Sequence, residues 1–171
     1  DIETLLVKKL PDYVGAAVSE LQVLTPTRKG VLGVENLNRR LQACLNPPNP
    51  EKPEKQSGDF TFRLGDKVMQ IKNDYEIPWE VRNSRGIAVE KGTGVFNGDM
   101  GVITEINRYT DSLTVRFDED RYVEYDGRHL PELEPAYAVT VHKSQGSEYP
   151  AVIIPMYPGP HMLMNRNLLY T

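Results

Sequence analysis

Apolar residues recur at helical spacing near the two ends of the chain and at strand spacing in its middle. Residues 1–13 mix leucines and lysines, which predicts an amphipathic helix that ends near Pro11. Residues 34–45 carry apolar side chains along one stripe and predict a second helix, with Asn38, Arg39 and Arg40 on its other sides.

A short apolar run, residues 21–24, separates these two helices and is typical of a buried strand. Thr25 ends it, because a residue that precedes a proline is held in an extended conformation. In the loop that follows, Arg28 and Lys29 lie between Pro26 and two glycines. A strand, a basic loop and a helix start form an anion-binding arrangement, since free amides point out of a helix N-terminus. A solvated surface loop is the alternative.

The middle of the chain alternates apolar and polar residues, after a proline-rich stretch at 46–58 that is typical of a linker. Turn residues separate the alternating runs. Five or so short antiparallel strands in this region predict a small β-barrel. The predicted strands cover residues 60–62, 66–72, 102–106, 113–117 and 121–125.

The stretch that follows combines an apolar face with a polar turn. Residues 136–143 predict a helix, the chain breaks at 144–147, and residues 151–154 form a continuous apolar run typical of a strand buried on both faces. A helix C-cap would account for Gly146 and Lys143. It would not account for five hydrogen-bonding side chains within nine residues, namely Thr140, His142, Lys143, Gln145 and Glu148.

Bulk composition limits the classes of function. The 171 residues suffice for one or two domains, and the fold class that the pattern predicts is α/β. Because the net charge is −4, any DNA contact has to rest on a local patch. A single cysteine, Cys44, excludes an internal disulfide and suits a reducing compartment. No run approaches a membrane span and no signal peptide heads the chain, so we expect a cytoplasmic protein with no membrane partner.

Residues 140–149 (TVHKSQGSEY) resemble motif V of superfamily 1 helicases, in the form carried by the RecD/TraA-like branch that includes the exodeoxyribonuclease V alpha subunit. Residues 24–42 look like the motif IV region of that branch, and residues 65–70 with 95–99 look like its inserted barrel. The resemblance implies a second RecA-like domain at 1–58 and 131–171, without motif VI, and an SH3-like barrel at 59–130. It implies part of an ATP-dependent helicase that moves 5′ to 3′ on single-stranded DNA, with single-stranded and double-stranded DNA as partners.

The same resemblance assigns roles to the polar residues. Thr140 and His142 would touch the DNA strand, with Lys143 among the cations beside it. Gly146 would let the backbone approach the γ-phosphate, Glu148 would reach the nucleotide sugar, and Gln145 would orient the turn or contact nucleotide. Arg28 would be the motif IV cation near the γ-phosphate, with Lys29 as the alternative.

Two patterns that imitate phosphate motifs are better explained otherwise. Residues 117–120 (FDED) follow an alternating strand rather than the fully buried strand of a Walker B motif, so they predict a hairpin turn. No two glycines lie five positions apart, so the P-loop pattern GxxxxGK[ST] is absent from these residues. We therefore expect no catalytic residue here, ATP and Mg²⁺ to be held with a missing first RecA-like domain, and no activity from this segment alone. His129 and His161 show no carboxylate or cysteine partner at ligand spacing, so no metal site is expected.

An insertion relative to the family pattern, residues 76–94, holds the sole tryptophan, Trp79. It predicts a long hairpin whose Trp79 packs on the barrel, or alternatively a finger that stacks on DNA bases. A different functional class also stays open. The barrel could be a protein-interaction module in a recombination nuclease complex, with nuclease subunits as partners, or in a conjugative relaxase-helicase.

Overall fold

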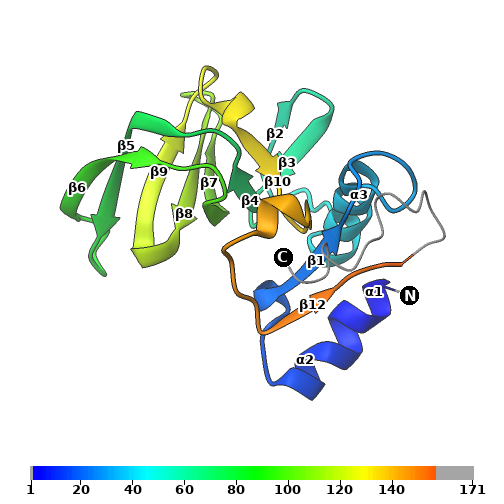
Figure 1. Cartoon of the computed structure of the whole chain (residues 1–171). Coiled ribbons are helices and arrows are strands. Elements are labelled where there is room, and N and C mark those ends of the chain that lie inside the picture. The colour runs from blue at the N-terminus through cyan, green and yellow to red at the C-terminus, as the bar shows by residue number, and fades with distance from the viewer. Residues whose placement is uncertain (1, 157–171) are drawn as a thin grey trace. The chain divides into compact units, whose positions relative to one another are not determined.

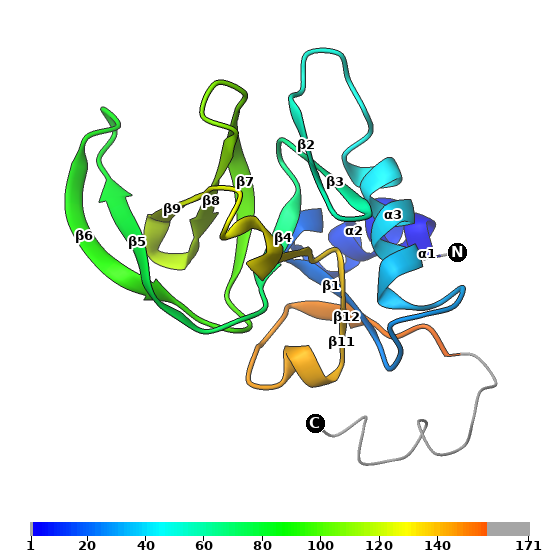
Figure 2. The same cartoon turned by 90° about the horizontal axis from the view of Figure 1, so that it is seen from above.

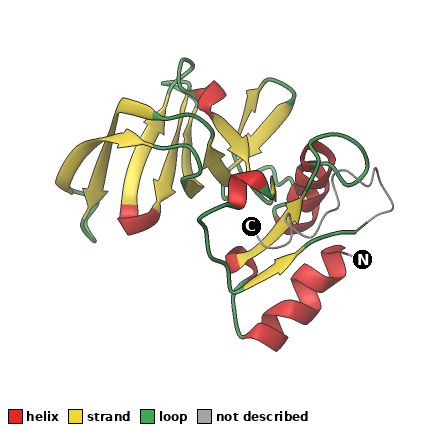
Figure 3. Ribbon diagram, in the orientation of Figure 1, coloured by secondary structure: helices red, strands yellow, loops and turns green. Residues whose placement is uncertain are grey.

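The computed structural model describes residues 2–156, and residue 1 and residues 157–171, which include His161, lie outside the described part. The chain divides into two compact units (Figure 1): residues up to Pro47 with those from Tyr137 onward, and residues Pro48–Ala136. The α-helices lie in the first unit, whereas strands and short helical turns make up the second (Figure 3).

The first unit is a small parallel sheet with helices. Its sheet has the order β11-β1-β12, from β1 (Leu21–Thr25), β11 (Ala138–Thr140) and β12 (Ala151–Ile153), and both neighbours run parallel to β1. Its helical segments are α1 (Ile2–Thr4), the π-helical turn η1 (Leu5–Lys9), α2 (Leu10–Val14), the 3₁₀ turn η2 (Val18–Glu20), α3 (Val34–Leu45) and the 3₁₀ turn η5 (His142–Ser144).

One apolar cluster joins these elements. The predicted strand at 21–24 and the predicted helix at 34–45 are both confirmed, and β1 is buried at every position. Side chains from the N-terminal helical segment, from α3 and from all three strands pack together, so a short sheet is covered by two helical segments at once. The buried members are Leu6, Leu21, Val23, Leu37, Leu41, Ala138 and Ile153.

The N-terminal helical segment runs past the predicted stop at Pro11. Pro11 lies in the first turn of α2, directly after the π-helical turn η1, in which Leu10 donates its N–H to Leu5 O. The segment ends instead at Gly15, which has a φ of 70° and donates its N–H to Pro11 O at 2.9 Å.

Two predictions for the region after residue 135 are wrong. Residues 138–140 form strand β11 rather than a helix, because pairing with β1 outweighs the helix propensity of Ala138 and the β-branched Val139 and Thr140 favour a strand. β12 is not buried on both faces: it ends the order of the described sheet, and Val152 is 43% exposed.

The second unit contains a seven-stranded antiparallel sheet and a separate two-stranded sheet, whose strands precede the others along the chain. The seven strands have the order β10-β4-β7-β8-β9-β5-β6, and among the described strands no ladder joins β10 to β6, so the expected closed barrel is not seen. The strands are β4 (Lys67–Gln70), β5 (Asp74–Arg82), β6 (Ala88–Val95), β7 (Met100–Asn107), β8 (Ser112–Phe117), β9 (Arg121–Tyr125) and β10 (Leu133–Pro135).

The two-stranded sheet lies partly in the stretch predicted as a linker. β2 (Glu54–Ser57) pairs with β3 (Phe60–Arg63) across a turn at Gly58, whose φ is 56°. Arg63 Nε reaches Glu54 Oε1 at 2.8 Å and holds the two strands together. The polar composition of residues 46–58 therefore did not predict β2, because the stability of this strand comes from its pairing with β3.

The predicted alternating strands of the second unit are otherwise confirmed, and they enclose an apolar core. Tyr125 is fully buried in it and donates its hydroxyl to Gln70 Oε1 at 2.7 Å. Gln70 Nε2 in turn donates to Glu132 Oε2 at 2.8 Å, on the 3₁₀ turn η4 (Leu130–Glu132). Because each buried polar group has a partner, this chain of bonds costs the core little.

The insertion at 76–94 forms the long hairpin of β5 and β6, which Figure 2 shows as a curved ribbon. Trp79 packs against the core of the second unit, so the packing expectation for this residue is confirmed. Residues 118–120 form η3 (Asp118–Asp120), the turn that joins β8 to β9, which confirms the hairpin prediction for FDED.

Candidate functional site

The parallel pairing of β1 with β11 brings two polar segments to one edge of the sheet. Thr25 and Thr140 are register partners, and each is the last residue of its strand. The chain after Thr25, residues 26–33, is called the β1 loop below, and residues 140–148, which begin with the last residue of β11, are called the β11 turn. Ligands of open α/β sheets bind outside the carboxyl ends of the strands, which is where both segments begin.

The β1 loop is folded tightly on itself. Thr25 Oγ1 donates to Leu32 O at 2.6 Å, and Thr27 Oγ1 donates to Lys29 O at 2.6 Å. A Cβ at Gly33 would lie 2.5 Å from the carbonyl group of Lys29, so only glycine fits at that position. The side chains of Arg28 and Lys29 are exposed on this closed loop.

The sequence pattern predicted free amides at the start of α3, but two of these N–H groups are not open to an anion. Val34 donates its N–H to Thr27 O at 3.1 Å, and Glu35 donates to Arg28 O at 3.2 Å. Two of the helix-start donors are therefore satisfied by the β1 loop itself. The Arg28 and Lys29 side chains are the cationic groups that this loop offers to an anion.

The β11 turn is held by bonds within its own backbone and by one threonine. Thr140 Oγ1 accepts the Lys143 N–H at 3.3 Å, and Ser144 Oγ donates to Val141 O at 2.7 Å. Gly146 has a φ of 82°, a left-handed conformation that favours glycine, and no atom of residues 2–156 lies within 4 Å of the place where its Cβ would be. The backbone at Gly146 is thus accessible to a ligand.

The candidate side chains of the β11 turn differ in exposure. His142, Gln145 and Glu148 are exposed, whereas Thr140 and Lys143 are partly buried. Tyr149 follows Glu148, and burial raises the pKa of its phenol despite a hydrogen bond from Ser147 that acts to lower it. Thr140 is the one candidate that the structure brings beside β1, through its register with Thr25.

Asn38 and Gln22 support this edge, and the residue pattern did not single them out. Asn38 is 1% exposed; its Nδ2 donates to Ala138 O at 2.9 Å, and its Oδ1 accepts the Ala138 N–H at 2.8 Å. The prediction that Asn38 lies on an outer side of α3 is therefore wrong. Its position four residues after Val34, on the apolar stripe, was the available signal.

Gln22 likewise holds the backbone of Tyr137, the residue before Ala138. It is fully buried within β1, and its Nε2 donates to Tyr137 O at 3.2 Å. Asn38 and Gln22 together fix the chain at residues 137–138, where it enters β11. Both act on the position of the β11 turn rather than on a ligand.

His129 does have carboxylate neighbours, which its sequence spacing did not reveal. Its Nδ1 lies 2.8 Å from Asp126 Oδ1 and its Nε2 lies 3.9 Å from Asp74 Oδ2. Burial acts to raise the pKa of Asp126, but N–H groups of Arg128 and His129 and the side chains of both residues lower it to about 2. Within residues 2–156 no group of three or more His, Cys, Asp or Glu side chains is arranged to hold a metal ion.

Two family models match the chain. Residues 37–117 match the model described as ATP-dependent RecD-like DNA helicase SH3 domain, and residues 135–171 match the UvrD-like helicase C-terminal domain. The first covers most of the second unit together with part of α3, and the second begins just before β11 and contains the β11 turn. No helix within residues 2–156 is long and apolar enough to cross a membrane.

Curated relatives agree with these matches. The ATP-dependent RecD2 DNA helicase of Deinococcus radiodurans is 36% identical over 151 residues, which cover 88% of this chain and 18% of the relative. The RecD subunit of the RecBCD enzyme from Mycobacterium tuberculosis is 29% identical over 160 residues, covering 94% of this chain and 24% of the relative. The chain thus spans less than a quarter of the length of either relative.

A solved structure shares the fold. The Pif1 helicase from Bacteroides, crystallised with ADP-AlF3 and single-stranded DNA, superposes with a TM-score of 0.52 at 19% identity. The likeness covers 90% of this chain and 39% of the Pif1 chain. At this identity the likeness concerns the arrangement of elements alone.

Proposed function

This chain belongs to the RecD-like superfamily 1 DNA helicases, and from that membership we propose that it supplies a nucleotide-contacting and DNA-contacting edge of an ATP-dependent DNA helicase. The observation that carries the proposal is the register of Thr25 with Thr140. It starts the β1 loop and the β11 turn at one edge of a parallel sheet, so that cations of the loop and polar groups of the turn can act on one ligand set.

In the proposed motor this chain forms the second RecA-like domain, residues 1–58 and 131–171, with an SH3 domain, whose described sheet is open, at 59–130. The β1 loop acts as motif IV and the β11 turn as motif V. Arg28, or Lys29 in its place, approaches the γ-phosphate of ATP, and the open backbone at Gly146 lies against the same group. Catalysis in such motors is largely positioning and charge stabilisation between two domains.

The remaining assignments divide the β11 turn between two ligands. Thr140, His142 and Lys143 contact single-stranded DNA, while Gln145 and Glu148 contact the nucleotide. The Thr140 hydroxyl accepts the Lys143 N–H, so its proton remains available for a phosphate oxygen. ATP and Mg²⁺ are shared with a first RecA-like domain that brings the P-loop, in a cytoplasmic enzyme that moves 5′ to 3′ and works alone or with nuclease subunits.

The test uses the polypeptide in which this chain is joined to a P-loop domain. We expect His142→Ala to weaken single-strand binding and DNA-stimulated ATP turnover while the KM for ATP changes little. We expect Glu148→Ala to raise the KM for ATP, with DNA affinity in the absence of nucleotide nearly unchanged. Arg85→Ala, on the exposed tip of the β5–β6 hairpin, is the matched surface control.

Kinetics separate the two assignments from a structural role. If both variants lower the melting temperature and reduce both affinities alike, the β11 turn serves folding and the ligand assignments are wrong. A reading frame that joins no P-loop domain to this chain would overturn the motor itself.

A further inference from the structure

The β1 loop and the first turn of α3 are joined into one body by hydrogen bonds. The N–H groups of Val34 and Glu35 donate to carbonyl groups of the loop, at 3.1 and 3.2 Å. Asn36 Nδ2 donates to Val31 O, near the tip of the loop, at 2.7 Å. A shift of the β1 loop therefore carries the start of α3 with it.

A few residues further along α3, Asn38 forms two hydrogen bonds with a single residue of β11. Its Nδ2 donates to Ala138 O at 2.9 Å, and its Oδ1 accepts the Ala138 N–H at 2.8 Å. Because hydrogen bonds are directional, two of them to one residue fix the orientation of the strand relative to the helix as well as the distance. Asn38 is 1% exposed, so water does not compete for either bond.

The β11 turn is held from two sides. Its first residue, Thr140, lies two residues after Ala138, so the Asn38 amide connects the turn to α3. On the other side, Val141 donates its N–H to Thr25 O at 3.1 Å, which connects the turn to β1. β1 is buried at every position and belongs to the sheet, whereas α3 is joined to the β1 loop. Of these two supports, the one through Asn38 follows the β1 loop when that loop moves.

We propose that Asn38 is a positioning residue that couples nucleotide binding at the β1 loop to the affinity of the β11 turn for single-stranded DNA. The inference rests on the proposed function, in which Arg28 or Lys29 approaches the γ-phosphate and the β11 turn contacts DNA. Coupling between two sites is carried by the rigid elements and hydrogen bonds that join them. Asn38 contacts neither ligand. It makes the turn follow the loop.

The experiment measures the dissociation constant of oligothymidine with and without the non-hydrolysable ATP analogue adenylyl imidodiphosphate. It uses the polypeptide in which this chain is joined to a P-loop domain. The ratio of the two constants is the coupling factor, which is typically about 5–150 between coupled sites. Asn38→Ala should bring this factor toward 1 by about threefold or more, and contacts of the analogue within the β11 turn account for the remainder. By reciprocity, the affinity for the analogue with and without DNA gives the same factor.

A matched control separates coupling from stability, since loss of the Asn38 amide also destabilises the first unit. Leu41 is 1% exposed on the same helix and packs in the apolar cluster of that unit. Leu41→Ala therefore destabilises the fold by opening a cavity, and it leaves the bonds between Asn38 and Ala138 in place. Its coupling factor should stay within about twofold of the native one. Asn38→Asp keeps the acceptor for the Ala138 N–H and loses the donor, so its factor should lie between those of the native and alanine forms even where the alanine form does not fold.

The outcomes distinguish this inference from the proposed function. Native coupling in the Asn38 variants, or an equal loss of coupling in Leu41→Ala, would overturn the inference and leave Asn38 as a residue that covers the edge of β11 in the described sheet. A native coupling factor of 1, with both ligands bound, would overturn it as well. A native polypeptide that binds neither the analogue nor oligothymidine would overturn the proposed function, and this inference with it.

Discussion

At the scale of single residues, backbone conformation and buried amides have more effect than exposed charge. Glu119 and Asp120 take left-handed conformations in the turn between β8 and β9, which costs about 1–2 kcal/mol for a residue with a Cβ. Both polar atoms of the Asn38 side-chain amide form hydrogen bonds with the backbone of Ala138. Neither feature follows from hydrophobicity, and each makes a measurable prediction.

Asp120→Gly should stabilise the second unit. The position has a φ of 54° and corresponds to the glycine of an Asn-Gly hairpin turn, so removing the Cβ relieves strain. After subtracting the entropy that glycine adds to the unfolded chain, we expect a gain of about 0.5 kcal/mol in the free energy of unfolding. Thermal or urea unfolding measures it. Asp118→Gly, two residues away and without a positive φ, should instead lose stability, and a loss in both variants would contradict this account.

Asn38→Ala should destabilise the first unit strongly. It leaves the N–H and the C=O of Ala138 buried without these partners, at about 1–3 kcal/mol for each group. We therefore expect a loss of about 2–4 kcal/mol in urea unfolding. Arg39→Ala, on the exposed neighbour, should change stability by less than about 0.5 kcal/mol. Similar losses in the two variants would show that Asn38 is an ordinary helix residue.

At the scale of elements, the β5–β6 hairpin depends on one glycine. Gly92→Ala places a methyl group 2.3 Å from the Trp79 ring, so the ring has to leave its site on the core. Overpacking of this kind costs about 1–3 kcal/mol. Gly127→Ala is the control, since nothing lies within 4 Å of its Cβ position. Tryptophan fluorescence should shift toward longer wavelength in the Gly92 variant alone; an unchanged spectrum would place Trp79 elsewhere.

The loop from Asp126 to His129, which follows β9, makes the free energy of unfolding depend on pH in acid. The pKa of Asp126 is lowered to about 2, so its contribution is present above about pH 4 and is lost as the pH falls toward 2. The pKa of Asp74 is also lowered, first by the N–H of Glu76, and acts in the same direction. Asp126→Asn should flatten the acid branch of stability against pH. An equally steep branch in that variant would assign the acid sensitivity to other groups.

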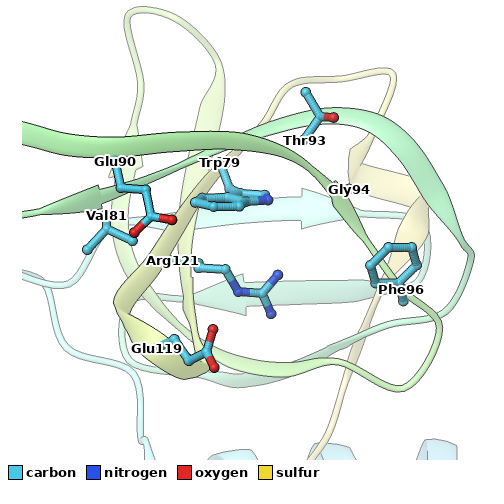
Figure 4. A pocket seen from close by; sticks show the side chains of 8 residues that line it. All are labelled: Trp79, Val81, Glu90, Thr93, Gly94, Phe96, Glu119 and Arg121. Atoms are coloured by element: carbon cyan, nitrogen blue, oxygen red, sulfur yellow. The ribbon is translucent and has the colours of Figure 1, made fainter.

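Local pattern predicted those elements whose own residues show two faces. Residues 113–117 and 121–125 alternate and form β8 and β9, and residues 34–45 carry a stripe and form α3. It failed at residues 138–140, where the partner strand β1 lies over a hundred residues away and decides the conformation. The pocket of the second unit that Trp79 and Glu119 line (Figure 4) was equally hidden, because these two residues are far apart along the chain.

At the scale of the whole molecule, the two units divide the proposed roles. The predicted nucleotide and DNA residues all belong to the first unit, whereas Trp79 and the pocket that it lines belong to the second. The resemblance to motifs IV and V is visible in the sequence. That the two segments lie at one edge of the sheet follows only from the parallel strand order β11-β1-β12. Which residues touch ATP remains a prediction.

The chain by itself should neither hydrolyse ATP nor bind DNA tightly. These 171 residues contain no P-loop pattern, and charge stabilisation by such parts is worth orders of magnitude in rate. In the absence of ATP, Arg28 and Lys29 can join Lys143 near a strand, and with about three cations the slope of log K against log salt should be about −2. Fluorescence anisotropy with oligothymidine measures it. Turnover that survives further purification, or binding insensitive to salt, would contradict the proposed division of labour.

The insertion of the second unit into the first has a consequence for how the chain folds. β1 and β11 pair in parallel although residues 48–136 lie between them, so their contact closes a loop of about a hundred residues. Closure of a long flexible loop is costly in entropy, and non-local pairing slows folding. In the seven-stranded sheet of the second unit, three of the six ladders are hairpins between strands that are neighbours in sequence, and their closure is short. Once this unit has folded, the flexible part of the long loop is replaced by a compact body, and the parallel sheet can close late at a smaller entropic cost.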